Sequence, residues 1–218
     1  MKIFPKEIKA VILDIDGTLA PGTSWTRLTR DLGASTDQHL KIFEEFTEGR
    51  ITYEDAVGQL LKLWRATGKA TKQDFQAIFE NWPLREESKE VVDFLKSKGY
   101  IVVKITGSMD LYAEVVAKKL GISFYYANTG LVWDNEGKLV DFHYFKDQAG
   151  KKVEQLLQFC REQGLSPEDC VVVGDGINDI ELFKLTRGVA LKSPNSAEIE
   201  KIAWKTIDNL SELKEALA

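Results

Sequence analysis

The sequence predicts an α/β fold: a doubly wound, Rossmann-like parallel sheet with an inserted small helical bundle and a β-hairpin. The first observation is an apolar, β-branched run at residues 10–15, which is followed by a long stretch of helical periodicity. The second is the alternation of short strands and helices after Pro83, which is typical of right-handed βαβ units. We therefore expect a core domain of residues 1–20 and 83–218, interrupted by a helical cap domain of residues 21–82.

The first strand, residues 10–15, reads Ala-Val-Ile-Leu-Asp-Ile and is apolar enough to be buried on both faces of a sheet. Apolar residues at helical spacing then predict four helices before Pro83, most clearly in the stripe from Tyr53 to Trp64. Proline ends the last of these helices because it cannot continue one. The breaks between the helices fall at Gly33, Gly49 and Gly68.

The rest of the chain alternates between strands and helices. Strands are expected at residues 100–105, 123–127, 170–173 and 188–191. Helices are expected at residues 91–95, 111–120, 153–163 and 180–185. Residues 131–145 read as a β-hairpin that turns at Asn135-Glu136-Gly137.

The composition excludes several classes of protein. The chain has 29 Lys and Arg residues against 34 Asp and Glu residues, and its net charge of −5 does not suit nucleic acid. No apolar run approaches the ~20 residues needed to cross a bilayer, and the N-terminal residues are too polar for a signal peptide. We therefore expect a cytoplasmic protein, monomeric or homodimeric, without a nucleic-acid or membrane partner. Cys160 and Cys170 are interpreted as ordinary thiols.

Acidic residues stand where two of the predicted strands end. Asp14 and Asp16 lie two positions apart at the end of the first strand, so they project from the same side. Asp175 follows the strand at residues 170–173, and Asp179 begins the next helix. Sites in open parallel sheets form at the carboxyl ends of strands, and carboxylates packed there require a cation, for which magnesium suits oxygen ligands. Asp179 is also compatible with an ordinary helix N-cap.

Two further segments offer groups that could hold a phosphate. The strand at residues 100–105 runs into a turn at Thr106-Gly107-Ser108, where a hydroxyl precedes a glycine amide. The start of a later helix carries two adjacent cations, Lys151 and Lys152. Lys104 is interpreted as a lysine at the edge or rim of the sheet.

In this order the motifs resemble those of the haloacid dehalogenase superfamily, and the resemblance covers nearly the whole chain. Residues 13–19, Leu-Asp-Ile-Asp-Gly-Thr-Leu, are similar to the first motif of that family. Residues 105–107 are similar to the second motif, and residues 174–179, Gly-Asp-Gly-Ile-Asn-Asp, to the fourth. The helices inserted after the first motif are similar to the cap of the phosphoserine-phosphatase branch.

The lysine of the third motif is identified by its distance along the chain. An ungapped match that runs back from Asp175 reaches Lys152, although Lys151 is adjacent and is not excluded. The stretch at Ala127-Asn128, with the hairpin after it, also resembles the phosphoserine-phosphatase branch.

The resemblance implies a covalent mechanism. Asp14 would attack phosphorus to form an aspartyl-phosphate, and Asp16 would protonate the leaving oxygen and later activate water. Magnesium would be held by the Asp14 carboxylate, the Asp16 backbone carbonyl and Asp175, with Asp179 supporting these ligands.

The resemblance also implies which groups hold the substrate. Thr106, the Gly107 amide and Lys152 would bind the transferring phosphoryl group, whose negative charge an enzyme must stabilise. Further candidates for contact with the substrate are Ser108, Asn178 and Trp25.

We expect a magnesium-dependent phosphatase that acts on a small-molecule phosphate monoester. A phosphomutase or phosphotransferase acting on a sugar phosphate is an alternative, because the same aspartyl-phosphate can be passed to another hydroxyl. A non-enzymatic phospho-acceptor protein also combines Asp, Thr and Lys on a doubly wound sheet. Asp16 argues against this last alternative, because such a protein needs a long-lived acyl-phosphate and no general acid beside it.

The sequence departs from the phosphoserine-phosphatase branch where that branch binds its amino-acid substrate. Residues 20–25 contain no acid, and the place of the expected cap arginine falls near Val57. The sequence therefore does not predict phosphoserine as the substrate. Periodicity favours core packing for Trp64, whereas Trp25 lies close to the first motif. The cap also carries Arg27, Arg50 and Arg65.

Overall fold

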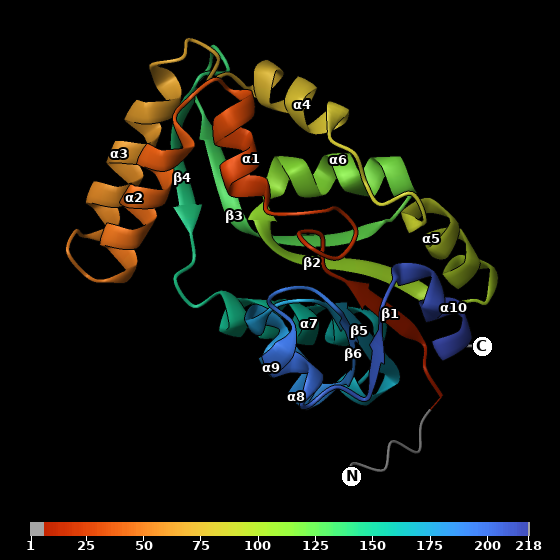
Figure 1. Cartoon of the computed structure of the whole chain (residues 1–218). Coiled ribbons are helices and arrows are strands. Elements are labelled where there is room, and N and C mark those ends of the chain that lie inside the picture. Colours follow the sequence, from red (N-terminus) through yellow and green to blue (C-terminus); the bar gives the residue numbers. More distant parts are fainter. Residues whose placement is uncertain (1–6, 218) are drawn as a thin grey trace.

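A central sheet organises the computed structural model, which describes residues 7–217 (Figure 1). Its strands are β1 (Ala10–Leu13), β2 (Ile101–Met109), β3 (Phe124–Trp133), β4 (Leu139–Tyr144), β5 (Cys170–Gly174), β6 (Arg187–Leu191) and β7 (Lys205–Ile207). Their order is β4-β3-β2-β1-β5-β6-β7, and all neighbours are parallel except β3 and β4. The predicted α/β fold with a Rossmann-like parallel sheet is confirmed.

Helices cover both faces of this sheet. Between β1 and β2 lie the predicted helices α1 (Ser24–Asp31), α2 (Thr36–Thr47), α3 (Tyr53–Arg65) and α4 (Lys72–Asn81). One face is covered by α5 (Ser88–Ser97), α6 (Asp110–Leu120) and α10 (Leu213–Ala216), and the other by α7 (Gln148–Gln163), α8 (Ile180–Leu185) and α9 (Ala197–Glu200). Short 3-10 helices occupy Pro167–Asp169, Ile177–Asp179 and Leu210–Glu212. Within residues 7–217, no helix is long and apolar enough to span a membrane.

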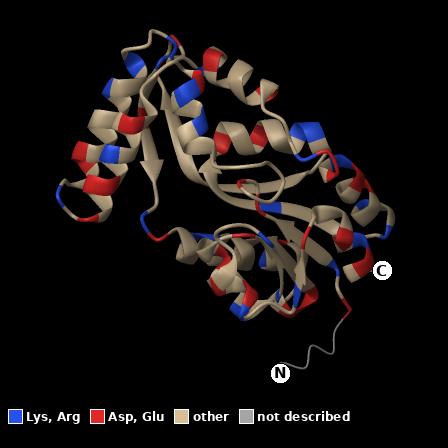
Figure 2. Ribbon diagram, viewed as in Figure 1, with Lys and Arg blue, Asp and Glu red and all other residues tan. Residues whose placement is uncertain are grey.

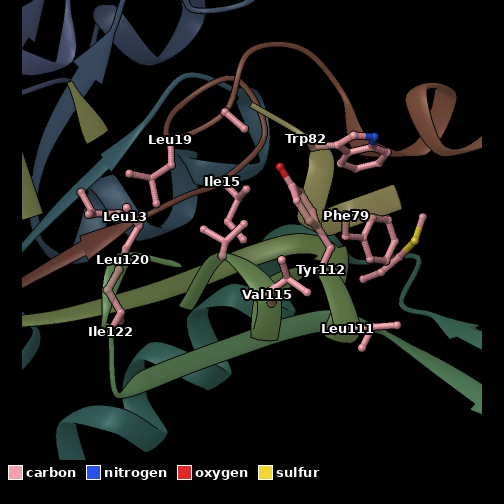
Figure 3. Packing of buried hydrophobic residues seen from close by; sticks show 14 of the residues in the cluster. Leu13, Ile15, Leu19, Phe79, Trp82, Leu111, Tyr112, Val115, Leu120 and Ile122 are labelled. Atoms are coloured by element: carbon pink, nitrogen blue, oxygen red, sulfur yellow. The ribbon is translucent and has the colours of Figure 1, made fainter. Parts of the chain in front are cut away.

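The side chains of β1 alternate between two apolar layers, which is why the whole strand is buried. Val11 and Leu13 belong to the layer beneath α5 and α6, and Ala10 and Ile12 to the layer beneath α7 and α8. Figure 3 shows part of the first layer, where Leu13 lies near Leu120 of α6, and Phe79 of α4 lies near Tyr112 of α6.

The two cysteines belong to the second layer. Cys160 and Cys170 are buried and free, with their Sγ atoms 3.8 Å apart. They are thiols, as the sequence predicts.

Local sequence signals determine where several helices begin and end. The Ser35 side chain caps α2, and a capping box between Thr52 and Asp55 begins α3. Gly121 and Gly164 end α6 and α7 in the left-handed conformation, with φ of 64° and 66°.

The inserted helices pack around the β3–β4 hairpin as well as against one another. The Tyr53 hydroxyl of α3 accepts a hydrogen bond from the Tyr144 amide of β4 at 2.9 Å. At the other end of α3, Arg65 donates to the Leu139 carbonyl of β4 at 2.8 Å. Trp64 is completely buried, as the sequence predicts. The fourth helix, α4, lies along α6 (Figure 1).

The strand β2 runs further than the sequence predicts. A turn is expected at residues 106–108, but the strand continues through them to Met109. It can do so because Met109 pairs with Thr129 in the extended β3, with an irregular register after Thr106. The glycine at position 107 therefore marks an irregularity in a strand and not its end.

Lys104 does not lie at the edge or rim of the sheet, so that interpretation was wrong. The strand β2 lies between β1 and β3, and the Lys104 side chain is fully buried. Its ammonium donates to the Ala113 carbonyl of α6 and lies 5.3 Å from the centre of the Tyr125 ring. Burial lowers the pKa of Lys104 to about 7. The Ala113 carbonyl of α6 thus accepts the buried ammonium of Lys104, a group that we expected to be in contact with water.

Candidate active site

The carboxyl ends of β1, β2 and β5 lie side by side in the sheet. The strand β1 pairs with β2 on one side and with β5 on the other. Asp14 follows β1 directly, Asp175 follows β5, and Thr106 lies within β2. The structure thus brings together residues that the sequence singles out from three separate segments.

Asp14, Asp175 and Asp179 form a compact acidic cluster. One carboxylate oxygen of each lies within 4.8 Å of the others, and all three residues are buried. Burial raises the pKa of Asp179 to about 7, although the charge of Lys152 opposes this. Burial, and then the charge of Asp14, also raise the pKa of Asp175. The charged forms of Asp175 and Asp179 are therefore disfavoured unless a further cation joins the cluster.

Lys152 enters this cluster from α7. Its Nζ lies 3.0 Å from Asp14 Oδ2 and 2.7 Å from Asp179 Oδ1, and its side chain is fully buried. Burial alone would lower the pKa of Lys152, but the two carboxylates outweigh it and raise the pKa above its ordinary value. Lys151 instead pairs with Glu154 at 2.8 Å. Of the two lysines that the sequence left open, only Lys152 contacts the cluster.

The Asp179 side chain does not cap a helix. It makes no capping hydrogen bond at the start of α8, and Asp179 Oδ1 accepts from Lys152. Asp179 thus occupies the N-cap position of α8, as the alternative expects, while its carboxylate binds Lys152 and not the amides of the helix.

Asp16 points toward the start of α1. Asp16 Oδ2 accepts hydrogen bonds from the Ser24 hydroxyl at 2.6 Å and from the Ser24 amide at 3.1 Å. The Ser24 hydroxyl also lies 2.6 Å from the Ser108 hydroxyl. Burial raises the pKa of Asp16 to about 7, against the effect of the Ser24 hydrogen bonds.

Ser24 is a site residue that the sequence reasoning missed. It is the first residue of α1, where the helical periodicity of the sequence begins. The amide groups at a helix N-terminus bind carboxylates, so a helix that starts eight residues after Asp16 was a usable signal.

Two glycines let the acidic residues approach closely. Gly17 has a φ of 76°, and a Cβ built on it would fall within 3.0 Å of both carboxylate oxygens of Asp175. A Cβ on Gly174 would fall within 3.0 Å of Asp179 Oδ2. The loop at Gly17 is held by Arg85, which donates to the Gly17 carbonyl at 2.8 Å. Arg85 is a second residue that the sequence reasoning missed.

A cavity of ≈ 720 Å³ opens above the acidic cluster, between α1, α2 and α3 and the carboxyl edge of the sheet. Its floor contains most of the predicted site residues: Asp14, Asp16, Thr106, Gly107, Ser108, Asp175 and Asn178. The Thr106 hydroxyl is buried and accepts from the Ser108 amide at 3.2 Å.

Trp25 belongs to the wall of this cavity. It is partly buried, and its ring stacks on Trp64 with the centroids 6.1 Å apart. The edges of Phe142 and Tyr144 also contact it, each with centroids 5.6 Å away. The residue therefore lies where a bound molecule would meet it.

The donor set of the acidic cluster fits a hard divalent cation. The groups are carboxylates only, and three of them stand against the one ammonium of Lys152. Asp179 Oδ2 is buried and has no hydrogen-bond partner within residues 7–217. Buried anions without partners are costly, and a cation such as magnesium would satisfy them.

Comparison with known proteins identifies the same family that the sequence motifs resemble. The family model for haloacid dehalogenase-like hydrolases matches residues 8–185. The phosphoserine phosphatase of Methanocaldococcus jannaschii is 31% identical over 182 residues, which cover 82% of this chain and 82% of that protein. The phosphoserine phosphatase of Streptococcus thermophilus is 27% identical over 189 residues, which cover 85% and 84%.

A solved structure has the same fold. It is described as "Phospho-Aspartyl Intermediate Analogue of Phosphoserine phosphatase", with a TM-score of 0.73 and 25% identity. The match covers 98% of this chain and 100% of that one.

Proposed function

The chain belongs to the haloacid dehalogenase-like hydrolases and is a phosphoric monoester hydrolase, and we propose that it uses magnesium and a phosphorylated Asp14 to hydrolyse small-molecule monoesters. The observation that carries this proposal is the buried Lys152 ammonium, 3.0 Å from Asp14 and 2.7 Å from Asp179, beneath a cavity that reaches the surface. A buried cation beside carboxylates suits a site that must receive a phosphoryl dianion.

Asp14 is the proposed nucleophile. Its Oδ1 accepts from the Ile15 amide at 2.8 Å and its Oδ2 accepts from Lys152, so the carboxylate is held in one orientation. In the first step a carboxylate oxygen bonds to phosphorus while the bond from phosphorus to the leaving oxygen breaks. Burial of Asp14 limits the access of competing water.

Asp16 is the proposed proton carrier. A pKa of about 7 allows Asp16 to hold a proton at neutral pH and to lose it to the leaving oxygen. The carboxylate that results can then take a proton from the water that attacks the acyl-phosphate. The hydrogen bonds from Ser24 fix the orientation of this carboxyl group.

The phosphoryl group is proposed to bind between β2 and α7. The Thr106 hydroxyl, the Gly107 amide and the Lys152 ammonium supply donors for its oxygens. Ser108 and Asn178 line the same floor and are proposed to contact the substrate.

The proposed magnesium ligands are the carboxylates of Asp14 and Asp175 and the backbone carbonyl of Asp16, with Asp179 behind them. The ion would neutralise charge on the phosphoryl oxygens. A Cβ at position 17 would collide with the Asp175 carboxylate. Glycine at this position therefore lets Asp175 approach the loop after β1, which supports this assignment.

Residues 21–82 are proposed to act as a cap over a core of residues 1–20 and 83–218. The cavity has helices of this segment on one side and the carboxyl edge of the sheet on the other. A cap of this kind would close over the substrate and exclude water during the reaction. The cytoplasmic location and the monomeric or homodimeric state stay predictions.

The test is phosphate release from a panel of monoesters, with magnesium and again with a chelator. The panel contains p-nitrophenyl phosphate, phosphoserine and glucose 6-phosphate. We expect release that stops with chelator, and a loss of about 100-fold or more in Lys152→Ala. Lys151→Ala is the matched control and should keep its activity.

Three results would overturn the proposal. They are equal activity with chelator, equal loss in the two lysine variants, and transfer of the phosphoryl group to an added sugar in place of water.

A further inference from the structure

We propose that the phosphate monoester hydrolysed at this site has an uncharged, apolar leaving group, aliphatic or aromatic, and not an amino acid. This inference rests on the proposed function and extends it to the class of substrate. It is carried by the side chains that form the wall of the cavity above Asp14.

The wall is built from apolar side chains of four elements. The helix α2 contributes one face at helical spacing, which includes Ile42, Phe43 and Phe46. The helix α3 contributes Val57 and Leu60, and α1 and β4 add aromatic rings. A leaving group attached to a phosphate on the floor would therefore extend against hydrocarbon.

Part of this wall is exposed although it is strongly apolar. Leu40 and Phe43 are each 51% exposed, and both line the cavity. Apolar side chains that gather at a cavity and remain uncovered are typical of a binding surface. An apolar leaving group would cover them and remove them from water.

The wall offers no charge to an amino-acid leaving group. Charged residues of both signs are spread over the molecule (Figure 2). Yet within the described chain the charged groups that line the cavity are the three floor aspartates, at positions 14, 16 and 175, and Arg85. Arg85 already donates to the carbonyls of Gly17 and Thr18.

The ammonium and carboxylate of phosphoserine would therefore find no charged partner on the wall. Moving unpaired charges out of water is costly. Lys146 lies beside the wall without lining the cavity, with its Nζ 5.7 Å from the centre of the Phe46 ring.

Two polar groups of the wall already have partners. The Tyr53 hydroxyl accepts from the Tyr144 amide at 2.9 Å and lies 3.4 Å from the Phe142 carbonyl. His39 Nδ1 lies 2.5 Å from the Thr29 hydroxyl. The Tyr53 hydroxyl and His39 Nδ1 are therefore occupied within the protein, and the wall presents mainly apolar area to a leaving group.

The cavity also has room for such a group. Its volume of ≈ 720 Å³ lies within the range of about 300–1,000 Å³ that is typical of small-molecule sites. A phosphate with a serine-sized group would leave most of the apolar wall uncovered.

The test is kcat/KM for phosphate release from ethyl, butyl and hexyl phosphate, with phosphoserine as the charged comparison. The three alkyl esters have similar leaving groups, so the chemical step stays constant while the apolar area grows. We expect kcat/KM to rise about threefold to fourfold for each added methylene, and so about 80-fold to 250-fold from ethyl to hexyl phosphate. Phosphoserine should be a poorer substrate than butyl phosphate.

Variants of the wall provide the matched comparison. Leu40→Ala and Phe43→Ala should flatten the dependence on chain length and leave inhibition by inorganic phosphate unchanged, because phosphate binds only the floor. Leu157→Ala changes another exposed leucine, which lies outside the cavity, and should keep the wild-type dependence.

Three outcomes separate this inference from the proposed function. Activity that is independent of chain length, or highest with phosphoserine, would overturn the inference and leave the phosphatase in place. Release of phosphate from p-nitrophenyl phosphate or glucose 6-phosphate but from none of the four esters would also overturn the inference alone. Release from none of these six compounds, with folded protein and magnesium, would overturn the proposed function itself.

Discussion

A methyl group added at Gly17 should weaken metal binding far more than it destabilises the fold. The φ of Gly17 is 76°, and a Cβ there would fall within 3.0 Å of both Asp175 carboxylate oxygens. Gly22 lies in the same loop with the same φ of 76°, but a Cβ there would meet nothing within 4 Å. The two alanine variants therefore share the backbone strain, and only Gly17→Ala displaces a proposed magnesium ligand.

The expected magnitudes follow from this geometry. Left-handed backbone costs an alanine roughly 1–2 kcal/mol, so both variants should lose about 1–2 kcal/mol of unfolding free energy from this strain. In Gly17→Ala the Asp175 carboxylate must also retreat by about 1 Å, whereas magnesium tolerates ligand shifts of about 0.2 Å. A misplacement of this size costs on the order of 100-fold in rate.

The assay is phosphate release at increasing magnesium concentration, with urea unfolding measured for each variant. Gly17→Ala should require at least tenfold more magnesium and lose about 100-fold in kcat/KM. Gly22→Ala should keep both values near wild type. If the two variants lost the same activity at every magnesium concentration, Asp175 would not be a magnesium ligand held in place by Gly17.

Three further changes test other parts of the structure. Lys104→Met should raise the unfolding free energy by about 2 kcal/mol at pH 7, because it removes a cation whose pKa burial lowers to about 7. Between pH 7 and pH 10 Lys104 binds more protons in the unfolded chain than in the folded one, so the wild type gains stability as the pH rises. The stability advantage of Lys104→Met should therefore shrink over this range. An advantage in urea unfolding that stays constant with pH would contradict this. Burial lowers the pKa of His39 to about 4, so wild type should lose about 2 kcal/mol from this residue between pH 7 and pH 5. His39→Asn should lack that loss, and parallel curves of stability against pH would refute it. Ser24→Ala should lower kcat about tenfold by releasing Asp16, with little change in the unfolding free energy; an unchanged kcat would refute it.

The strand ends and the inserted helices were predictable because they depend on local patterns. Apolar β-branched runs that stop at Asp14 and Asp175 mark two strand ends, and a repeating apolar stripe marks α3. Adjacent strands then bring those ends together through the parallel pairing of the sheet. The choice of Lys152 over Lys151 came from an ungapped match along the chain, and the helix α7 gives only Lys152 a contact with the cluster.

Features that depend on distant partners were not predictable. The Ser24 hydroxyl reaches Ser108, 84 positions away in the chain, and no local pattern encodes that contact. Lys104 is buried because a carbonyl of α6 accepts its ammonium. The extension of β2 to Met109 depends on pairing with Thr129, which outweighs the tendency of glycine to end a strand.

The apolar wall of the cavity was also hidden in the sequence. Phe43 and Phe46 form a weak amphipathic pattern that is equally typical of a packed helix. Only their position above the carboxyl edge of the sheet gives them a possible role in binding.

The most direct test of the account is to find the phosphoryl group on the protein. Turnover of p-nitrophenyl phosphate is stopped with acid, and the peptides are analysed by mass spectrometry. The account predicts a phosphorylated Asp14 in wild type with magnesium, and neither adduct nor turnover in folded Asp14→Asn. Phosphate release at the wild-type rate by Asp14→Asn, or a phosphoryl group on a different residue, would contradict it.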